Sequence, residues 1–158
     1  MTLTVRLARP DDLPAVFALR HDVFVIGQDV PVDLERDEYD DRADHALAAR
    51  DGVVLGTGRL VSGRIGEDGV LVPGTAGTVG TIGRMAVADA ARGTGVGRAL
   101  LDLLVARAQE RGLPSVELHS QLHACGFYER AGFTPFGEVY VEAGIEHLCM
   151  RRELDGIA

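Results

Sequence analysis

The fold prediction starts from Arg92-Gly93-Thr94-Gly95-Val96-Gly97-Arg98. This stretch follows the apolar run from Ile82 to Val87 and precedes an amphipathic helix that we expect to begin near Val96. A glycine-rich turn that opens a helix leaves several backbone NH groups without intrahelical partners, at the positive end of the helix dipole and with few side chains in the way. The stretch therefore predicts a binding site for a pyrophosphate group.

Two common phosphate-binding motifs do not fit this turn. A Walker loop requires a lysine that the chain does not offer at that place, and the third glycine of G-x-G-x-x-G is missing whether counted from Gly93 or from Gly95. The stretch does fit R-x-x-G-x-G, with Arg92, Gly95 and Gly97 in the fixed places. Taken alone, it is equally typical of an ordinary glycine-rich junction between a strand and a helix.

A second motif lies downstream, between Ser120 and Phe133. Its pattern is A-x-x-F-Y-x-x-x-G-F, and it is filled by Ala124, Phe127, Tyr128, Gly132 and Phe133. With both motifs in this order, the chain resembles the GNAT superfamily of acetyl-CoA-dependent N-acyltransferases, whose markers are R/Q-x-x-G-x-G/A and this later pattern. Within that superfamily the chain is similar to the ElaA-like branch from about residue 5 to residue 152. The segments that carry this similarity are Leu19-Arg20, 23–25, the Gln28 region, 40–45 and 142–147.

Composition and charge limit the classes of protein that the chain can belong to. At 158 residues, with 46% hydrophobic and 25% charged residues, it suits one globular domain spanning residues 1–158. A net charge of −8 weighs against binding to nucleic acid or to an anionic membrane. Residues 1–6 have no apolar core of the length that a signal peptide needs, and no apolar stretch has the length of a membrane span, so we expect a cytoplasmic protein. Cys125 and Cys149 lack metal-ligand spacing and are expected to be reduced thiols.

The order of elements predicts an α/β (α+β) fold. Strands are expected at 5–8, 45–49, 53–61, 79–88, 116–119, 133–141 and 146–152, and helices after Asp11-Asp12, from about Val96 to Gly112, and from Gln121 to Ala131. The resemblance sharpens this to the GNAT acyl-CoA N-acyltransferase fold. That fold has a mixed, mostly antiparallel sheet of six to seven strands, splayed between the fourth and fifth strands to admit pantetheine and flanked by about four helices.

The resemblance also implies the residues that bind acetyl-CoA. Backbone groups of a bulged strand bond the pantetheine amides and the acetyl carbonyl, a preorganised arrangement that stabilises the developing oxyanion. The glycine turn holds the diphosphate, with arginines adding charge-assisted contacts. The matching positions are Met85, Ala86, Val87, Arg92, Gly93, Thr94, Gly95, Val96, Gly97, Arg98, Gln121 and Tyr128. Arg98, beside Asp102, can equally be a solvated arginine, and Gln121 can instead cap its own helix.

Tyr128 matches the family's tyrosine that protonates the departing CoA thiolate, and its reference pKa of about 10 keeps it protonated at neutral pH. It can alternatively be a core aromatic residue. The residue that deprotonates the amine is less clear, because the strand before Met85 carries no carboxylate. By position His119 and His123 are the better candidates, with Glu117, His147 and a chain of water molecules as alternatives.

The acidic run from Asp33 to Asp41 is interpreted as a solvated face, with attraction of a cationic amine as the alternative. His45 follows Asp44, but no second ligand has a supporting spacing, so no metal site is predicted. We therefore expect an N-acetyltransferase that moves an acetyl group from acetyl-CoA to a small-molecule or peptide amine in a ternary complex. The alternative is a non-catalytic acyl-CoA-binding sensor. No nucleic acid or membrane partner is expected, and a homodimer is left open.

Overall fold

The structure is a computed structural model that describes residues 2–154. These residues form two compact units, one made of residues 2–59 and 84–105 and the other of residues 60–83 and 106–154. Three elements contribute to both units, β3 (Val53–Ser62), β4 (Gly80–Val87) and α3 (Val96–Glu110). The expectation of one domain over residues 1–158 stays a prediction.

In the first unit the hydrogen-bonded order is β1-β2-β3-β4. β1 (Leu3–Leu7) runs antiparallel to β2 (Asp44–Arg50), with Leu3 opposite Arg50. The turn Asp51-Gly52 joins β2 to β3 with φ angles of 54° and 77°, the left-handed pair that a tight two-residue hairpin requires. The hairpin expected from the Asp-Gly pair is therefore confirmed.

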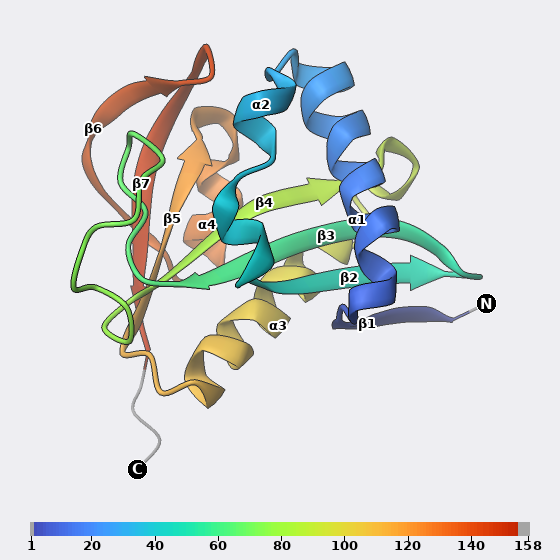
Figure 1. Ribbon diagram of the computed structural model, residues 1–158, viewed down its shortest axis with the longest axis horizontal. Helices are drawn as coiled ribbons and strands as arrows, with labels where there is room; N and C mark the ends of the chain where they lie inside the picture. Colours follow the sequence, from blue (N-terminus) through green and yellow to red (C-terminus); the bar gives the residue numbers. More distant parts are fainter. Residues whose placement is uncertain (1, 155–158) are drawn as a thin grey trace. The chain divides into compact units, whose positions relative to one another are not determined.

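Helices cover both faces of these strands (Figure 1). Gly56 faces α3, because a Cβ there would lie 2.7 Å from Leu100, so the glycine allows helix and strand to approach closely. Side chains alternate along a strand, so Arg59 of β3 points to the opposite face. On that face lies α1 (Leu13–Arg20), whose Phe17 ring packs edge-on against His45 of β2 at 5.7 Å.

The chain from α1 to β2 is more irregular than the sequence indicates. A π-helical segment, His21–Ile26, continues directly from α1. α2 (Val32–Glu35) and a 3-10 turn, Glu38–Asp41, follow. The acidic run is therefore divided between a short helix and a turn, with Glu35, Tyr39 and Asp40 buried, rather than forming one solvated face.

In the second unit the order is β3-β4-β5-β7-β6. β5 (Ser115–Gln121) is parallel to β4, with a paired register of Gly80–Ile82 against Val116–Leu118. β7 (Ile145–Glu153) is antiparallel to both β5 and β6 (Thr134–Glu142). The pairing of β6 with β7 shifts register between Phe136 and Tyr140, and Gly137 in that interval has a φ of 74°. A register shift at a left-handed glycine is typical of a β-bulge.

One helix boundary was predicted wrongly. A single helix was expected from Gln121 to Ala131, but Gln121 ends β5, where it pairs with His147 of β7. A 3-10 turn, Leu122–Ala124, and the short α4 (Cys125–Arg130) follow. Strand pairing with β7 outweighs the local helical pattern at Gln121.

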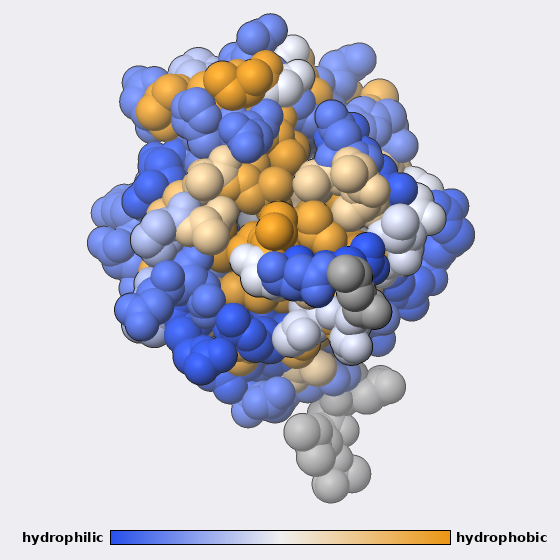
Figure 2. All heavy atoms as spheres, turned by 90° about the vertical axis from the view of Figure 1, so that its right-hand side faces the viewer, coloured by the Kyte–Doolittle hydropathy of each residue, from blue (hydrophilic) through white to orange (hydrophobic). Residues whose placement is uncertain are grey.

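The predicted fold class is otherwise confirmed. Residues 2–154 contain a mixed sheet of seven strands and four α-helices, with parallel pairing between β4 and β5. α3 begins at Val96, as expected, and buries Val96, Leu100 and Leu104. Across residues 2–154, no helix has the length and apolar character that crossing a membrane requires. On the face in Figure 2, hydrophilic side chains surround an apolar area.

Candidate functional site

The glycine turn lies in the first unit, between a 3-10 turn, Asp89–Ala91, and α3. Gly93 and Gly95 have φ angles of 75° and 87°, which L-residues adopt only at a cost. A Cβ at either glycine would meet nothing within 4 Å. The protein itself therefore does not fill the space beside these two glycines, and the first amides of the helix that follows have no intrahelical partners.

The polar side chains of the turn contact their neighbours in the chain. Thr94 donates its hydroxyl hydrogen to the carbonyl of Ala91. Arg92 pairs with Asp89 at 3.1 Å, and Arg98 pairs with Asp102 at 3.0 Å. The arginines are well exposed, with 59% and 47% of their side chains accessible, so both can swing toward an incoming anion.

β4 carries an unusual backbone conformation just before Met85. Arg84 has a φ of 52°, which costs a residue with a Cβ about 1–2 kcal/mol. Its side chain holds this conformation from outside the strand, because the guanidinium donates to the carbonyls of Glu35 at 3.0 Å and Leu34 at 3.2 Å, and to Asp37 at 3.2 Å. The irregularity lies in the strand for which the resemblance implies a bulge, and Met85, Ala86 and Val87 follow it.

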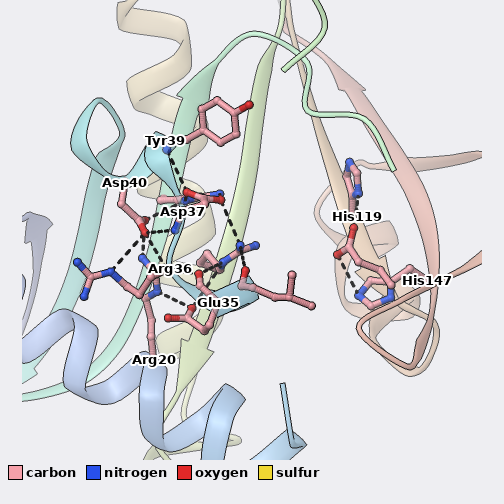
Figure 3. A network of polar contacts seen from close by, with 12 residues as sticks. Arg20, Glu35, Arg36, Asp37, Tyr39, Asp40, His119 and His147 are labelled. Carbon is pink, nitrogen blue, oxygen red and sulfur yellow. Dashed lines mark hydrogen bonds and ion pairs between the residues drawn. The ribbon is translucent and has the colours of Figure 1, made fainter. Parts of the chain in front are cut away.

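A buried ionic network anchors the same segment, and the sequence did not reveal it. Arg20 of α1 binds Glu35 at 2.8 Å and Asp40 at 2.7 Å, and all three side chains are at most 3% exposed. Arg59 of β3 binds Asp37 at 2.6 Å and Asp40 at 2.8 Å. Figure 3 shows these acidic side chains converging on the arginines.

The network changes the interpretation of the acidic run. Burial would raise the pKa of Asp40, but the hydrogen bond and charge of Arg20 and the charge of Arg59 outweigh it and lower that pKa. The interpretation as a solvated face is wrong for Glu35 and Asp40, which are 3% exposed. The partners lie 15 to 22 residues away along the chain, so the local charge pattern gives no sign of them.

In the second unit, Tyr128 lies on α4 between two aromatic rings. Its ring packs edge-on against Phe127 at 5.0 Å and against Phe133 at 6.1 Å. Burial raises the pKa of Tyr128 to about 12, so the hydroxyl is neutral at physiological pH. Within residues 2–154 the hydroxyl makes no hydrogen bond, which leaves it available to a ligand.

The two candidate histidines have different surroundings. His123 is exposed on the 3-10 turn after β5, and its Nε2 lies 2.8 Å from Oε1 of Gln121. His119 is enclosed on β5, with 13% of its side chain accessible. Its Nε2 lies 2.8 Å from the carbonyl of Ile65, and its Nδ1 lies 2.6 Å from the Tyr140 hydroxyl.

Acidic groups near His119 change its proton affinity. Burial lowers the pKa of His119, but the hydrogen bond and charge of Glu142, whose Oε1 lies 3.3 Å from Nδ1, outweigh burial and raise it. Glu142 also lies 3.8 Å from His147 of β7. Figure 3 shows His119 and His147 in the same region, on the neighbouring strands β5 and β7. The sequence singled out His119 but neither Glu142 nor Tyr140.

Glu117 is a poor candidate for a base. Arg64 donates to both of its oxygens, at 2.8 and 2.7 Å, and Arg151 donates to Oε2 at 2.5 Å. Burial raises the pKa of Glu117, but these arginines outweigh burial and lower it. A carboxylate held in this way has little affinity for a further proton.

A cavity of about 160 Å³ lies on this face of the second unit. Glu117 and His119 from β5, and Cys149, which pairs with His119 across the strands, lie on its wall. The segment after β3 closes it through Ile65 and Glu67. The cavity thus brings an apolar wall and titratable groups together beside His119.

Residues 2–154 contain no group of three or more His, Cys, Asp or Glu side chains placed to hold a metal ion. His45, considered from the sequence as a metal ligand, places its Nε2 2.9 Å from the carbonyl of Asp40. Burial lowers the pKa of His45, which keeps the ring neutral.

Comparison with known proteins assigns the family. The family described as "Acetyltransferase (GNAT) domain" matches residues 28–154. The chain belongs to the GNAT acetyltransferase family. Among its relatives, ElaA of Escherichia coli is 32% identical over 144 residues, which cover 90% of this chain and 88% of ElaA. The resemblance to the ElaA-like branch is therefore confirmed.

Solved structures of GNAT proteins agree with this assignment. Crystal structures of E. coli ElaA and of an acyl-CoA N-acyltransferase from Pseudomonas aeruginosa match with TM-scores of 0.79 and 0.76, at 27% and 33% identity. Each match covers 96% of this chain, together with 100% of the ElaA chain and 98% of the Pseudomonas aeruginosa chain. The yncA protein of Salmonella typhimurium, solved with its cofactor acetyl-CoA, matches with a TM-score of 0.77 over 98% of this chain and 95% of the yncA chain. Its sequence identity is 21%, so this match supports the fold alone.

Proposed function

We propose that this GNAT protein transfers an acetyl group from acetyl-CoA to an amine by direct attack within a ternary complex. The open turn at Gly93 and Gly95 is the observation that carries the proposal, because backbone amides at a helix start are suited to a diphosphate. In this proposal Arg92, Gly93, Thr94, Gly95, Val96, Gly97 and Arg98 hold the diphosphate, and Gln121 contacts pantetheine. yncA, of the same fold, binds acetyl-CoA in its crystal structure.

The backbone of Met85, Ala86 and Val87 is proposed to hold the acetyl group. Attack of an amine on the thioester places negative charge on the carbonyl oxygen, which a fixed backbone NH stabilises before the charge forms. The left-handed conformation of Arg84 interrupts the regular strand just before these residues. Its anchoring to Glu35 and Asp37 keeps this part of the backbone fixed.

Tyr128 is proposed to assist the departing thiolate. A thiol has a pKa near 8.5, so full proton transfer from a hydroxyl of pKa about 12 is uphill by roughly 5 kcal/mol. Tyr128 therefore acts mainly as a hydrogen-bond donor to the developing thiolate, and solvent supplies the proton that completes CoA. This refines the general-acid role expected from the sequence.

His119 is the proposed acceptor of the amine proton. Its pKa is raised by Glu142 against the effect of burial, whereas Glu117 is neutralised by two arginines. His123 is exposed and lies outside the cavity wall that His119 lines. The acceptor is an amine of a small molecule or a peptide. A cytoplasmic location and the absence of nucleic acid or membrane partners remain predictions.

Calorimetry with acetyl-CoA, ATP and NAD tests the donor, and thiol release with a panel of amines tests the transfer. We expect acetyl-CoA to bind and thiol release to require an amine. The chain contains no lysine, so release that depends on added amine cannot come from acetylation of its own lysines. Binding without amine-dependent release would instead establish the acyl-CoA sensor, and absence of acetyl-CoA binding would refute both functions.

A further inference from the structure

His119 has no ring nitrogen available to an incoming amine. A carbonyl oxygen only accepts hydrogen bonds, so Nε2 must carry the hydrogen that it shares with Ile65 at 2.8 Å. Nδ1 of the neutral ring then has a lone pair, and the Tyr140 hydroxyl donates to it at 2.6 Å. A proton therefore enters the ring at Nδ1. Of the two groups beside this nitrogen, the Tyr140 hydroxyl at 2.6 Å and the Glu142 carboxylate at 3.3 Å, only the hydroxyl has a hydrogen to donate.

The Tyr140 hydroxyl has the capacity to accept a second hydrogen bond. One hydrogen goes to His119, which leaves two lone pairs on the oxygen. Cys149 offers only a weak S–H donor at 4.0 Å. Tyr140 itself is partly exposed on β6, beyond the register shift that follows Phe136.

We propose that Tyr140 is the catalytic group that contacts the acceptor amine, and that Tyr140, His119 and Glu142 form a proton relay for the transfer. The proposal rests on the proposed acetyltransferase function. In this relay Tyr140 contacts the amine and His119 holds the proton. Glu142 is a positioning residue that stabilises the charged imidazolium of His119.

The step balances without a further reactant. The amine nitrogen bonds to the thioester carbonyl carbon and becomes positively charged. Its N–H bond breaks and the proton passes to the Tyr140 oxygen, while the Tyr140 O–H proton passes to Nδ1 of His119. Tyr140 ends neutral and His119 ends as an imidazolium facing Glu142. The C–S bond breaks with its electron pair on sulfur, and His119 later returns the proton to solvent.

The surroundings favour storage of a proton at this place. Burial raises the pKa of Tyr140, and Glu142 raises it further, so tyrosinate is not formed as a separate species. The titratable and charged groups around the relay come from β5, β6, β7 and the segment after β3: Glu117, His119, Tyr140, Glu142, His147, Cys149, Arg64 and Glu67.

The test compares Tyr140→Phe with the unmodified protein. Thiol release is followed across pH with two acceptors, an alkylamine and the weakly basic methoxyamine. The relay predicts that Tyr140→Phe lowers kcat/KM for the alkylamine about 10²-fold at neutral pH, while the Kd of acetyl-CoA stays within about twofold. The loss should shrink as the pH rises and should be below about tenfold for methoxyamine, whose attacking nitrogen loses its proton to water more readily.

A double-mutant cycle supplies a second readout. If Tyr140 and His119 act as one relay, Tyr140→Phe combined with His119→Gln should lose no more activity than Tyr140→Phe alone. Unchanged kcat/KM and pH profile in Tyr140→Phe would overturn the relay while leaving the acetyltransferase intact. An equal loss for both amines at every pH would overturn it as well, because that pattern reports packing. Absence of thiol release from the unmodified protein would overturn the proposed function itself.

Discussion

The substitution Gly95→Ala tests the diphosphate site most directly. Gly95 has a φ of 87°, and a Cβ added there would meet nothing within 4 Å, so the protein presents no steric obstacle. The change should cost only the left-handed conformation, about 1–2 kcal/mol of unfolding free energy. For a chain of this length that corresponds to a fall in Tm of roughly 2–8 °C.

The effect on the ligand should be larger than this strain explains. If the amides after Gly95 contact the diphosphate, the methyl group enters the space that a phosphate oxygen occupies. Loss of one hydrogen bond to a charged group costs about 1.5–3 kcal/mol, which corresponds to a 10- to 150-fold increase in the Kd of acetyl-CoA. Titration calorimetry measures the Kd, and scanning calorimetry measures the Tm.

Gly52→Ala is the matched control. Gly52 has a φ of 77° in the β2–β3 turn, and a Cβ there also meets nothing within 4 Å. The Gly52→Ala variant should show the same fall in Tm as Gly95→Ala, with a Kd of acetyl-CoA within about twofold of that of the unmodified protein. A Gly95→Ala variant that loses stability like the control but binds acetyl-CoA normally would refute the placement of the diphosphate at this turn.

Three further predictions concern the remaining parts of the site. Tyr128→Phe should lower kcat about 10- to 150-fold, the value of one hydrogen bond to a charged group, with the Kd of acetyl-CoA unchanged; unaltered kcat in a thiol-release assay would remove Tyr128 from the mechanism. Arg84→Gly should be more stable than Arg84→Ala by about 1–2 kcal/mol in urea unfolding, because glycine adopts the φ of 52° freely. Both variants should lose turnover, because the guanidinium group that anchors the strand is gone. Equal stability of the two variants would contradict strain at this position. Arg20 and Arg59 lower the pKa of Asp40, so its contribution to the free energy of unfolding is complete above the unfolded pKa of about 4 and is lost as the pH falls toward the folded pKa. Asp40→Asn should lower the free energy of unfolding by about 3–5 kcal/mol near pH 7 and should reduce the loss of stability at acid pH. An unaltered pH dependence of unfolding would count against the network.

The parts of the site that the sequence predicted depend on short-range geometry. Gly93 and Gly95 adopt positive φ angles just before the helix that begins at Val96, and all of this information lies within a few residues. The Asp51-Gly52 hairpin is predictable for the same reason. In each case a glycine permits a backbone conformation that other residues resist, and the neighbouring pattern shows where it is needed.

The parts that the sequence missed depend on pairing between distant segments. His119 and Tyr140 are 21 residues apart, and their contact follows from the pairing of β6 with β7 and its register shift. Gly137 inside an apolar strand was a usable signal for a bulge there, but not for which side chain it would direct toward His119. Gln121 was assigned to a helix because its pairing with His147 is likewise non-local.

The ionic network also bears on the choice of acceptor. The alternative for the acidic run was attraction of a cationic amine, which requires carboxylates with uncompensated charge. Glu35, Asp37 and Asp40 instead bind the guanidinium groups of Arg20, Arg59 and Arg84, and Arg36 lies 3.6 Å from Asp40, so within this network four positive charges meet three negative ones. Arginine stays charged at every physiological pH and binds two carboxylates through its planar group, which suits it to a permanent buried network. Glu35, Asp37 and Asp40 therefore serve mainly to fix Arg84, and through it the backbone that precedes Met85, rather than to recruit a cationic substrate.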